Sequence, residues 1–243
     1  MNDRSNSFAA NALRRSLCGV RAYDMLADQK PAIETAEGLE AAAVAIALHA
    51  FEDMDTNEPL AELDRLACKV TQRLHHPTPT AILAHLHEVL FEEERFGPPL
   101  GGHLPLHVYL PTALALHRAV DVTLALIYKA IARRAGLSAV AVTNGGRFLI
   151  LVLSEEPPQL VDVSQGGRVV ARDELVRNGQ PLPAHNLSRP YNGPSLRMVS
   201  HREWVARMLT CLEYHYWQGG HLLDMAAMGE MLTLVDSWEY SSG

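Results

Sequence analysis

Lysine, cysteine and long apolar runs are all scarce in this chain of 243 residues. Only three lysines occur, and the 21 lysines and arginines form no dense cluster in a chain whose net charge is −7. Neither nucleic acid nor an anionic membrane surface is therefore expected as a partner. No stretch approaches the roughly 18 uninterrupted apolar residues that a membrane-spanning helix needs, so no membrane span is expected.

The three cysteines, at positions 18, 68 and 211, are too few and too widely spaced for a disulfide framework or a zinc motif. The polar stretch 1–15 lacks the continuous apolar segment of a signal peptide. Arginine and alanine are abundant, as in proteins from GC-rich bacterial genomes. We therefore expect a bacterial, cytoplasmic protein, and nothing in the sequence calls for a cofactor.

The period of the apolar residues changes near the middle of the chain. Helical spacing predicts helices at about 36–54, 59–74, 79–95, 121–135, 200–218 and 221–236. After Gly136, stretches rich in Val, Ile and Leu predict short strands at about 138–142, 147–153 and 159–163. This change of period predicts an α+β fold, with a helical N-terminal half, a small antiparallel sheet and a C-terminal helix pair.

Six short stretches occur in the order, and near the spacing, of one known family. They are Leu63-Asp64 with Leu66-Ala67, Val89 to Glu93 with Phe96-Gly97, Tyr109-Leu110 with Leu114, Ala132 to Leu137, Asp162 with Gly166-Gly167, and Arg207 to Leu209 with Tyr216. Together they resemble the transglutaminase-like domain of the bacterial SirB type, which often carries a tetratricopeptide-like helix pair at its C-terminus. The resemblance covers most of the chain.

The resemblance implies a fold and a domain plan. The core would be transglutaminase-like, hence papain-like, and would occupy residues 36–177. Residues 1–35 would form an N-terminal arm or helix, 178–198 a linker rich in proline and asparagine, and 199–238 the tetratricopeptide-like pair. A single unit of that kind cannot bury its own apolar face, so it packs on the main domain or on a partner.

The chain departs from the family at the catalytic positions. The resemblance places Thr123 where the nucleophilic cysteine is expected and Arg147 where the histidine is expected, while Asp162 matches the aspartate. Arginine stays protonated and cannot act as the base of a Cys-His-Asp site. Thiol protease, thiol amidase and transglutaminase chemistry are therefore disfavoured. The same resemblance implies that these three residues and Asp121 lie around one cleft.

Each candidate site residue has a structural and a functional interpretation. Asp121 is either a helix N-cap or a general base, and Arg147 with Asp162 is either a structural ion pair or part of a ligand site. In the functional interpretation, Arg147 binds a small anionic substrate and Asp121 or Asp162 accepts its proton. Thr123 then lines the site as a hydrogen-bonding wall.

Three further residues are weaker candidates for substrate binding. His107 and Tyr109 lie at or beside a motif near the expected cleft, and Glu92 belongs to another family motif. A metal site built from His103, His107 and Glu92 is the less favoured alternative, because no paired metal-ligand spacing occurs.

Two classes of function follow. The first is a repurposed enzyme of small-molecule biosynthesis, such as that of antibiotics and other secondary metabolites, which displaces an anionic leaving group, as in ring closure by an amine. The second is an inactive scaffold or partner subunit that forms homo- or hetero-oligomers through its C-terminal helices.

Overall fold

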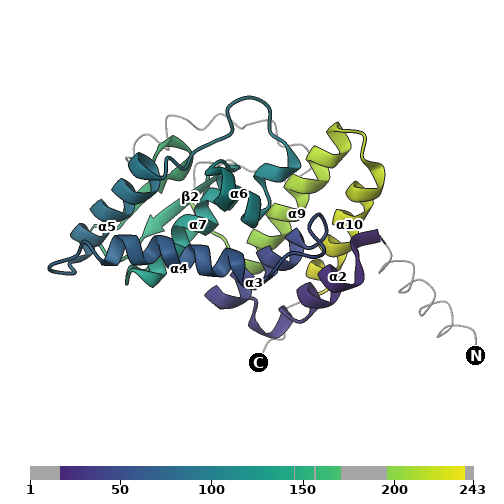
Figure 1. Ribbon diagram of the computed structural model, residues 1–243, viewed down its shortest axis with the longest axis horizontal. Coiled ribbons are helices and arrows are strands. Elements are labelled where there is room, and N and C mark those ends of the chain that lie inside the picture. Colours follow the sequence, from purple (N-terminus) through teal and green to yellow (C-terminus); the bar gives the residue numbers. More distant parts are fainter. Residues whose placement is uncertain (1–16, 145, 156, 171–195, 239–243) are drawn as a thin grey trace, which may run out of the picture. The chain divides into compact units, whose positions relative to one another are not determined.

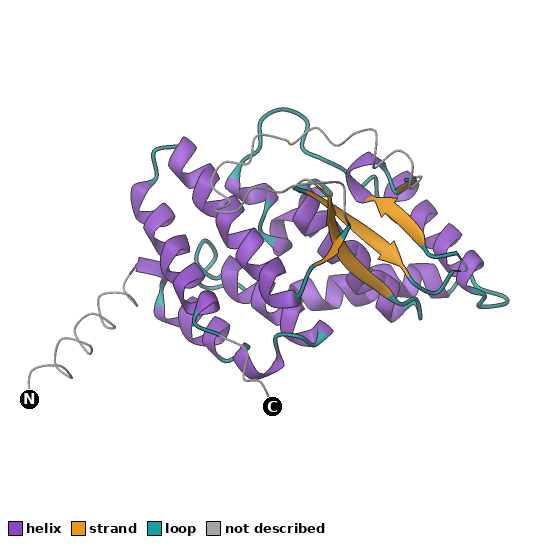
Figure 2. Ribbon diagram, turned by 180° about the vertical axis from the view of Figure 1, so that it is seen from behind, coloured by secondary structure: helices purple, strands orange, loops and turns teal. Residues whose placement is uncertain are grey.

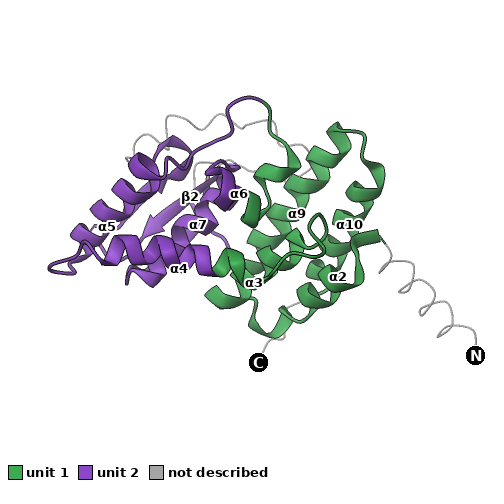
Figure 3. Ribbon diagram, in the orientation of Figure 1, with its two compact units in different colours: residues 1–60, 102–112, 201–243 green, residues 61–101, 113–200 purple. Residues whose placement is uncertain are grey.

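The computed structural model describes residues 17–144, 146–155, 157–170 and 196–238, which form two compact units (Figure 3). The first unit comprises residues 1–60, 102–112 and 201–243, and the second comprises 61–101 and 113–200. Each unit therefore joins segments that are far apart in the sequence. Most of the predicted linker and about half of the predicted N-terminal arm lie outside the described residues.

The first unit is built around four helices, α2 (Val20–Ala27), α3 (Ala36–Ala47), α9 (His201–Gln218) and α10 (Leu222–Asp236). α9 and α10 pack against each other, and α3 packs on both α2 and α9 (Figure 1). Two short 3-10 turns, η1 (Lys30–Ala32) and η3 (Pro105–His107), belong to the same unit. The apolar face of the last two helices is buried through Trp204, Met208, Leu212, Met228, Met231 and Val235.

Charged side chains close the ends of these last two helices. The carboxylate of Glu34 accepts hydrogen bonds from the backbone N–H groups of His201 and Arg202, at 3.0 and 3.2 Å. The Arg202 guanidinium donates to the carbonyl oxygens of Val235 and Asp236, at 3.3 and 3.2 Å. An anion at a helix N-terminus and a cation at a C-terminus both oppose the helix dipole, so these contacts stabilise the pair.

The second unit contains most of α4 (Glu58–Thr71), with α5 (Pro79–His87), the π-helical turn η2 (Glu88–Glu93), the end of α6 (Leu110–Leu116) and α7 (Asp121–Arg134). α7 is buried along most of its length and packs on the sheet of this unit. Such a helix needs apolar residues around its whole circumference, which its sequence supplies. None of the described helices is long and apolar enough to cross a membrane.

Two predicted helices end earlier than their apolar spacing indicated. The helix predicted over 79–95 is α-helical only to His87 and continues as the π-helical η2 to Glu93, where the amide of Glu94 bonds the carbonyl of Val89 five residues back. The helix predicted over 36–54 ends at Ala47, and the following residues form turns. Apolar spacing cannot distinguish these turns from a continuing helix, since it reports only which residues are buried.

The sheet of the second unit has five strands in the order β4-β3-β2-β1-β5, all antiparallel (Figure 2). The strands are β1 (Ala139–Asn144), β2 (Arg147–Val152), β3 (Gln159–Asp162), β4 (Arg168–Val169) and β5 (Arg197–Met198). The predicted α+β fold with a small antiparallel sheet is therefore confirmed. In β1 and β2, Asn144 pairs with Arg147, so Arg147 opens β2.

A partly buried histidine at the end of α5 contacts η2 and α7. His87 Nε2 is 2.8 Å from the Tyr128 hydroxyl, and the rings of His87, Phe91 and Tyr128 contact one another. Gly167 closes this cluster with φ +76°, and a Cβ there would lie 2.3 Å from the Phe91 ring. Glycine is therefore required at this position both for backbone conformation and for space. Burial lowers the pKa of His87 to about 4.

We expect acid to destabilise the fold through His87. The unfolded chain takes up the proton near the ordinary pKa of 6.5, whereas the folded chain takes it up only near 4. The free energy of unfolding should therefore fall by roughly 3 kcal/mol as the pH falls from about 6.5 to about 4. Urea titrations at several pH values measure this loss. His87→Gln should reduce the pH dependence by that amount, whereas His85→Gln, on the same helix, should retain it.

Candidate functional site

Asp121 connects the start of α7 to the start of β2. Its Oδ1 accepts a hydrogen bond from the Val122 amide at 2.8 Å, and its Oδ2 accepts one from the Phe148 amide at 3.1 Å. The N-cap position itself is held by Val120, one residue earlier than the structural interpretation of Asp121 places it. Asp121 nevertheless accepts a hydrogen bond from an amide in the first turn of α7, and its negative charge stabilises the positive end of the helix dipole. Its second oxygen connects the helix to the sheet through the Phe148 amide.

Arg147 and Asp162 form an ion pair between β2 and β3. Arg147 Nη2 donates to Asp162 Oδ2, and Asp162 Oδ1 accepts from the Ser164 amide at 3.0 Å. The latter bond caps the 3-10 turn η4 (Val163–Gln165). The Asp162 side chain is 1% exposed, whereas that of Arg147 is 33% exposed. A buried carboxylate therefore holds one edge of a guanidinium whose other part reaches the surface.

Arg147 retains donors beyond this pair. A guanidinium carries five N–H groups, and the bond to Asp162 uses one of them. Within the described part of the chain, no other residue accepts a hydrogen bond from Arg147. Asp121 binds the amide of Phe148, the next residue, so a half-buried carboxylate bonds to the backbone directly beside the arginine.

Thr123 is fully buried in the first turn of α7. Its backbone amide bonds the carbonyl of Val120 at 3.1 Å, as part of the helix start. A side chain with no exposed surface cannot reach a ligand without rearrangement of its neighbours. The position therefore favours a packing role for Thr123 over contact with substrate.

The three weaker candidates lie on other segments of the chain. Glu92 is exposed on η2. His107 and Tyr109 belong to the first unit, where His107 Nδ1 accepts from the Leu104 amide at 3.1 Å and the Tyr109 hydroxyl bonds that of Tyr216 at 2.7 Å. Among the described residues, no group of three or more His, Cys, Asp or Glu side chains is arranged to hold a metal ion.

A polar cluster in the first unit was not predicted. His49 Nε2 bonds Asp224 Oδ1 at 3.0 Å, and the His49 and Tyr216 rings meet edge to face with centroids 6.1 Å apart. His49 and Asp224 are separated by 175 positions, and no local motif surrounds either residue. Only a tertiary structure can bring such residues together.

Asp121, Arg147 and Asp162 are therefore presented by one helix and two strands of the second unit. The family profile described as transglutaminase-like superfamily matches residues 57–210, more than half of the chain. The chain therefore belongs to the transglutaminase-like superfamily. No curated protein and no solved structure matches it.

We expect thiol alkylation to leave any activity of this protein intact. Burial, followed by the charge of Glu230 and a hydrogen bond to it, raises the pKa of the Cys18 thiol to about 12. Cys68 is exposed, and none of the three cysteines lies on α7 or the sheet. Iodoacetamide should therefore label Cys68 far faster than Cys18. Mass spectrometry with a parallel ligand-binding assay checks this, and stoichiometric labelling of one cysteine that removes binding would contradict it.

Proposed function

We propose that this protein is a SirB-type member of the superfamily whose papain-like core has lost its Cys-His-Asp chemistry and now binds a small anionic substrate. The observation that carries this proposal is the environment of the Arg147 guanidinium. A buried carboxylate holds its guanidinium on one side, while its remaining donors lie at a one-third exposed position. Guanidinium groups of this kind bind carboxylate, phosphate and sulfate through paired hydrogen bonds.

The reaction that we propose is displacement of an anionic group in bacterial, cytoplasmic small-molecule biosynthesis, such as that of antibiotics. A substrate amine loses a proton to an aspartate, and its nitrogen attacks a carbon that bears a sulfate or phosphate ester. The carbon–oxygen bond breaks, and the anion leaves with the bonding electron pair while Arg147 binds its oxygens. The products are a cyclic amine and inorganic sulfate or phosphate, so neither an oxidant nor a cofactor is consumed.

Asp121 is the better candidate for the base. Asp162 is buried and is occupied by Arg147 and the Ser164 amide, so its role is to position the arginine. Asp121 is only half-buried, although its two oxygens also accept backbone hydrogen bonds. A base must come within hydrogen-bond reach of the proton that it accepts, and Asp121 meets this condition more readily than Asp162.

A scaffold or partner subunit is the alternative, and one observation favours it. Large apolar side chains are exposed around the turn between α9 and α10, namely Trp217 at 55%, Leu222 at 62% and Leu223 at 73%. Exposed apolar groups of this kind mark protein-interaction surfaces. In this alternative the helix pair, as a tetratricopeptide-like unit, contacts a second protein or a second copy of the chain.

Three variants decide between the alternatives: Arg147→Met, Asp121→Asn and Asp162→Asn. Each is assayed for binding of small anions by calorimetry, for release of sulfate or phosphate from amine esters, and for melting temperature. If the protein is an enzyme, Arg147→Met should lose anion binding or turnover, and so should Asp121→Asn. If all three variants are only less stable and still bind and turn over, the residues are structural contacts, and the scaffold is the better conclusion.

A further inference from the structure

Two loops of the second unit meet just before α7 in a strained arrangement. Arg95 and His117 have positive φ values, of 57° and 54°, which non-glycine residues rarely adopt. Gly97 and Arg118 form an isolated parallel bridge, in which the Gly97 amide bonds the His117 carbonyl at 3.2 Å. The Phe96 and His117 rings stack with centroids 4.5 Å apart. Such backbone conformations persist only where their surroundings enforce them, and they occur often at ligand sites.

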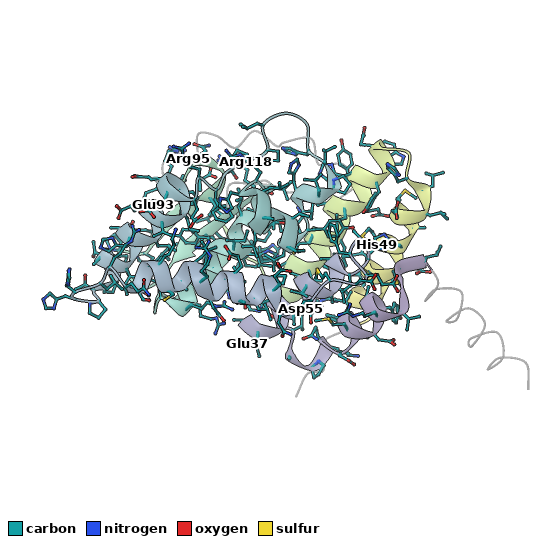
Figure 4. The ribbon with its side chains drawn as sticks, in the orientation of Figure 1. Glu37, His49, Asp55, Glu93, Arg95 and Arg118 are labelled. Carbon is teal, nitrogen blue, oxygen red and sulfur yellow. The ribbon has the colours of Figure 1, made fainter. Side chains whose placement is uncertain are left out.

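This arrangement fixes the guanidinium of Arg118. Its Nη1 donates to the carbonyl oxygens of Arg95 and of His117, the latter at 2.8 Å. Its Nη2 and Nε groups donate to no residue in the part of the chain that the structure describes. The Arg95 side chain is exposed and, in the same part, makes no hydrogen bond or ion pair. Figure 4 shows the two labelled arginines next to each other.

Two acidic residues close to these arginines, Glu93 and Glu94, have other partners. The carboxylate of Glu94 binds Lys69 at 2.5 Å and lies 3.7 Å from His117 Nε2, and that of Glu93 binds Arg73 at 2.6 Å. Arg95 and Arg118 therefore keep their charges unpaired within the described residues, in a chain whose net charge is −7. The Arg118 guanidinium reaches the Arg95 backbone, so the two residues carry unpaired positive charge on neighbouring segments, and such charge attracts an anion.

We propose that Arg95 and Arg118 form a second anion site, which binds a tetrahedral oxyanion, the sulfate or phosphate group of a small molecule. Arg118 supplies the fixed partner, because two backbone carbonyls hold its guanidinium. Arg95 supplies an adaptable partner that closes on the anion from the solvent side. The remaining donors of both groups suit the several oxygens of a tetrahedral anion better than the two oxygens of a carboxylate.

Calorimetric titration of the full chain with sodium sulfate and sodium phosphate, at constant ionic strength maintained with chloride, tests the site. Arg95→Gln should weaken binding about tenfold, because one charge-assisted contact is lost. Its melting temperature without anion should be unchanged, since the exposed side chain makes no hydrogen bond or ion pair with the described residues. Arg118→Gln should remove binding at this site, and Arg118→Lys should restore part of it. Lys30→Gln removes an exposed charge from the other unit and should bind as the wild type does.

Several further results of these titrations decide whether the site exists. Unchanged binding in Arg95→Gln and Arg118→Gln, or equal competition by chloride, would refute the site. If Arg118→Gln does not fold, Arg95→Gln still decides the result. Methyl sulfate and phenyl phosphate, titrated in parallel, distinguish an ester from the free anion. Arg147→Met should leave anion binding by Arg95 and Arg118 unaffected. The site at Arg147 and the site at Arg95 and Arg118 can therefore be refuted independently of each other.

Discussion

Replacement of Asp121 by asparagine is expected to lower turnover by about 10²–10⁴-fold, because the variant lacks the group that accepts the proton of the amine. The neutral side chain keeps the shape of aspartate, and its one oxygen can still accept from the amide of either Val122 or Phe148. Anion binding at Arg147 should therefore change much less than turnover. The measurement is the rate of sulfate or phosphate release from an amine ester, divided by the fraction of folded protein.

Stability must be followed separately in this variant. Loss of one of two charge-assisted bonds to backbone amides costs roughly 1.5–3 kcal/mol of unfolding free energy. Asp28→Asn is the matched control, because Asp28 is exposed and makes no side-chain contact among the described residues. A variant at Asp121 that melts earlier but keeps full turnover per folded molecule would show that Asp121 only connects α7 to the sheet.

Arg147→Met is expected to weaken binding of the anionic group by roughly 2–4 kcal/mol, which corresponds to a dissociation constant about 30- to 1000-fold higher. Methionine keeps much of the length of the side chain and loses every donor. Calorimetry with sulfate, phosphate and a carboxylate measures the loss. Lys30→Met, which removes an exposed charge in the first unit, serves as the control.

The same substitution leaves the buried Asp162 carboxylate without its cation, so it also destabilises the fold. The double variant Arg147→Met with Asp162→Asn separates the two effects. It should recover stability, because no buried charge is left unpaired, but it should not recover anion binding. Asp162→Asn alone should retain most of the anion binding, since the asparagine oxygen can still accept from Arg147 and keep it in position. If the double variant binds anions as the wild type does, Arg147 is a structural residue.

The helices and the sheet were largely predictable, because their signals are local. The apolar run of α7 ends beside Gly136, and the change to strand-like stretches follows directly, so α7, β1 and β2 agree with prediction to within two residues. The end of α3 at Ala47 and the π turn after His87 were not predictable. Both depend on which backbone carbonyl each amide selects, and apolar spacing does not encode that choice.

The site was predictable only in part. Family motifs placed Arg147 and Asp162 opposite each other, and the structure pairs them. The bond from Asp121 to the Phe148 amide had no sequence signal, because a backbone donor is available at almost every residue. His107 and Tyr109 lie close to Asp121 in sequence, yet they belong to the first unit and Asp121 to the second. Closeness in sequence therefore did not place these residues in the same compact unit.

The amino-acid sequence by itself determined the α+β class and, through its ordered motifs, the membership of the transglutaminase-like superfamily. These properties depend on residue identity and on spacing along the chain. Only the tertiary structure decided that Thr123 is buried, that Asp162 anchors Arg147, and that Arg118 is held on two carbonyls. Burial and hydrogen bonding depend on how distant segments pack, and that information resides in the whole fold.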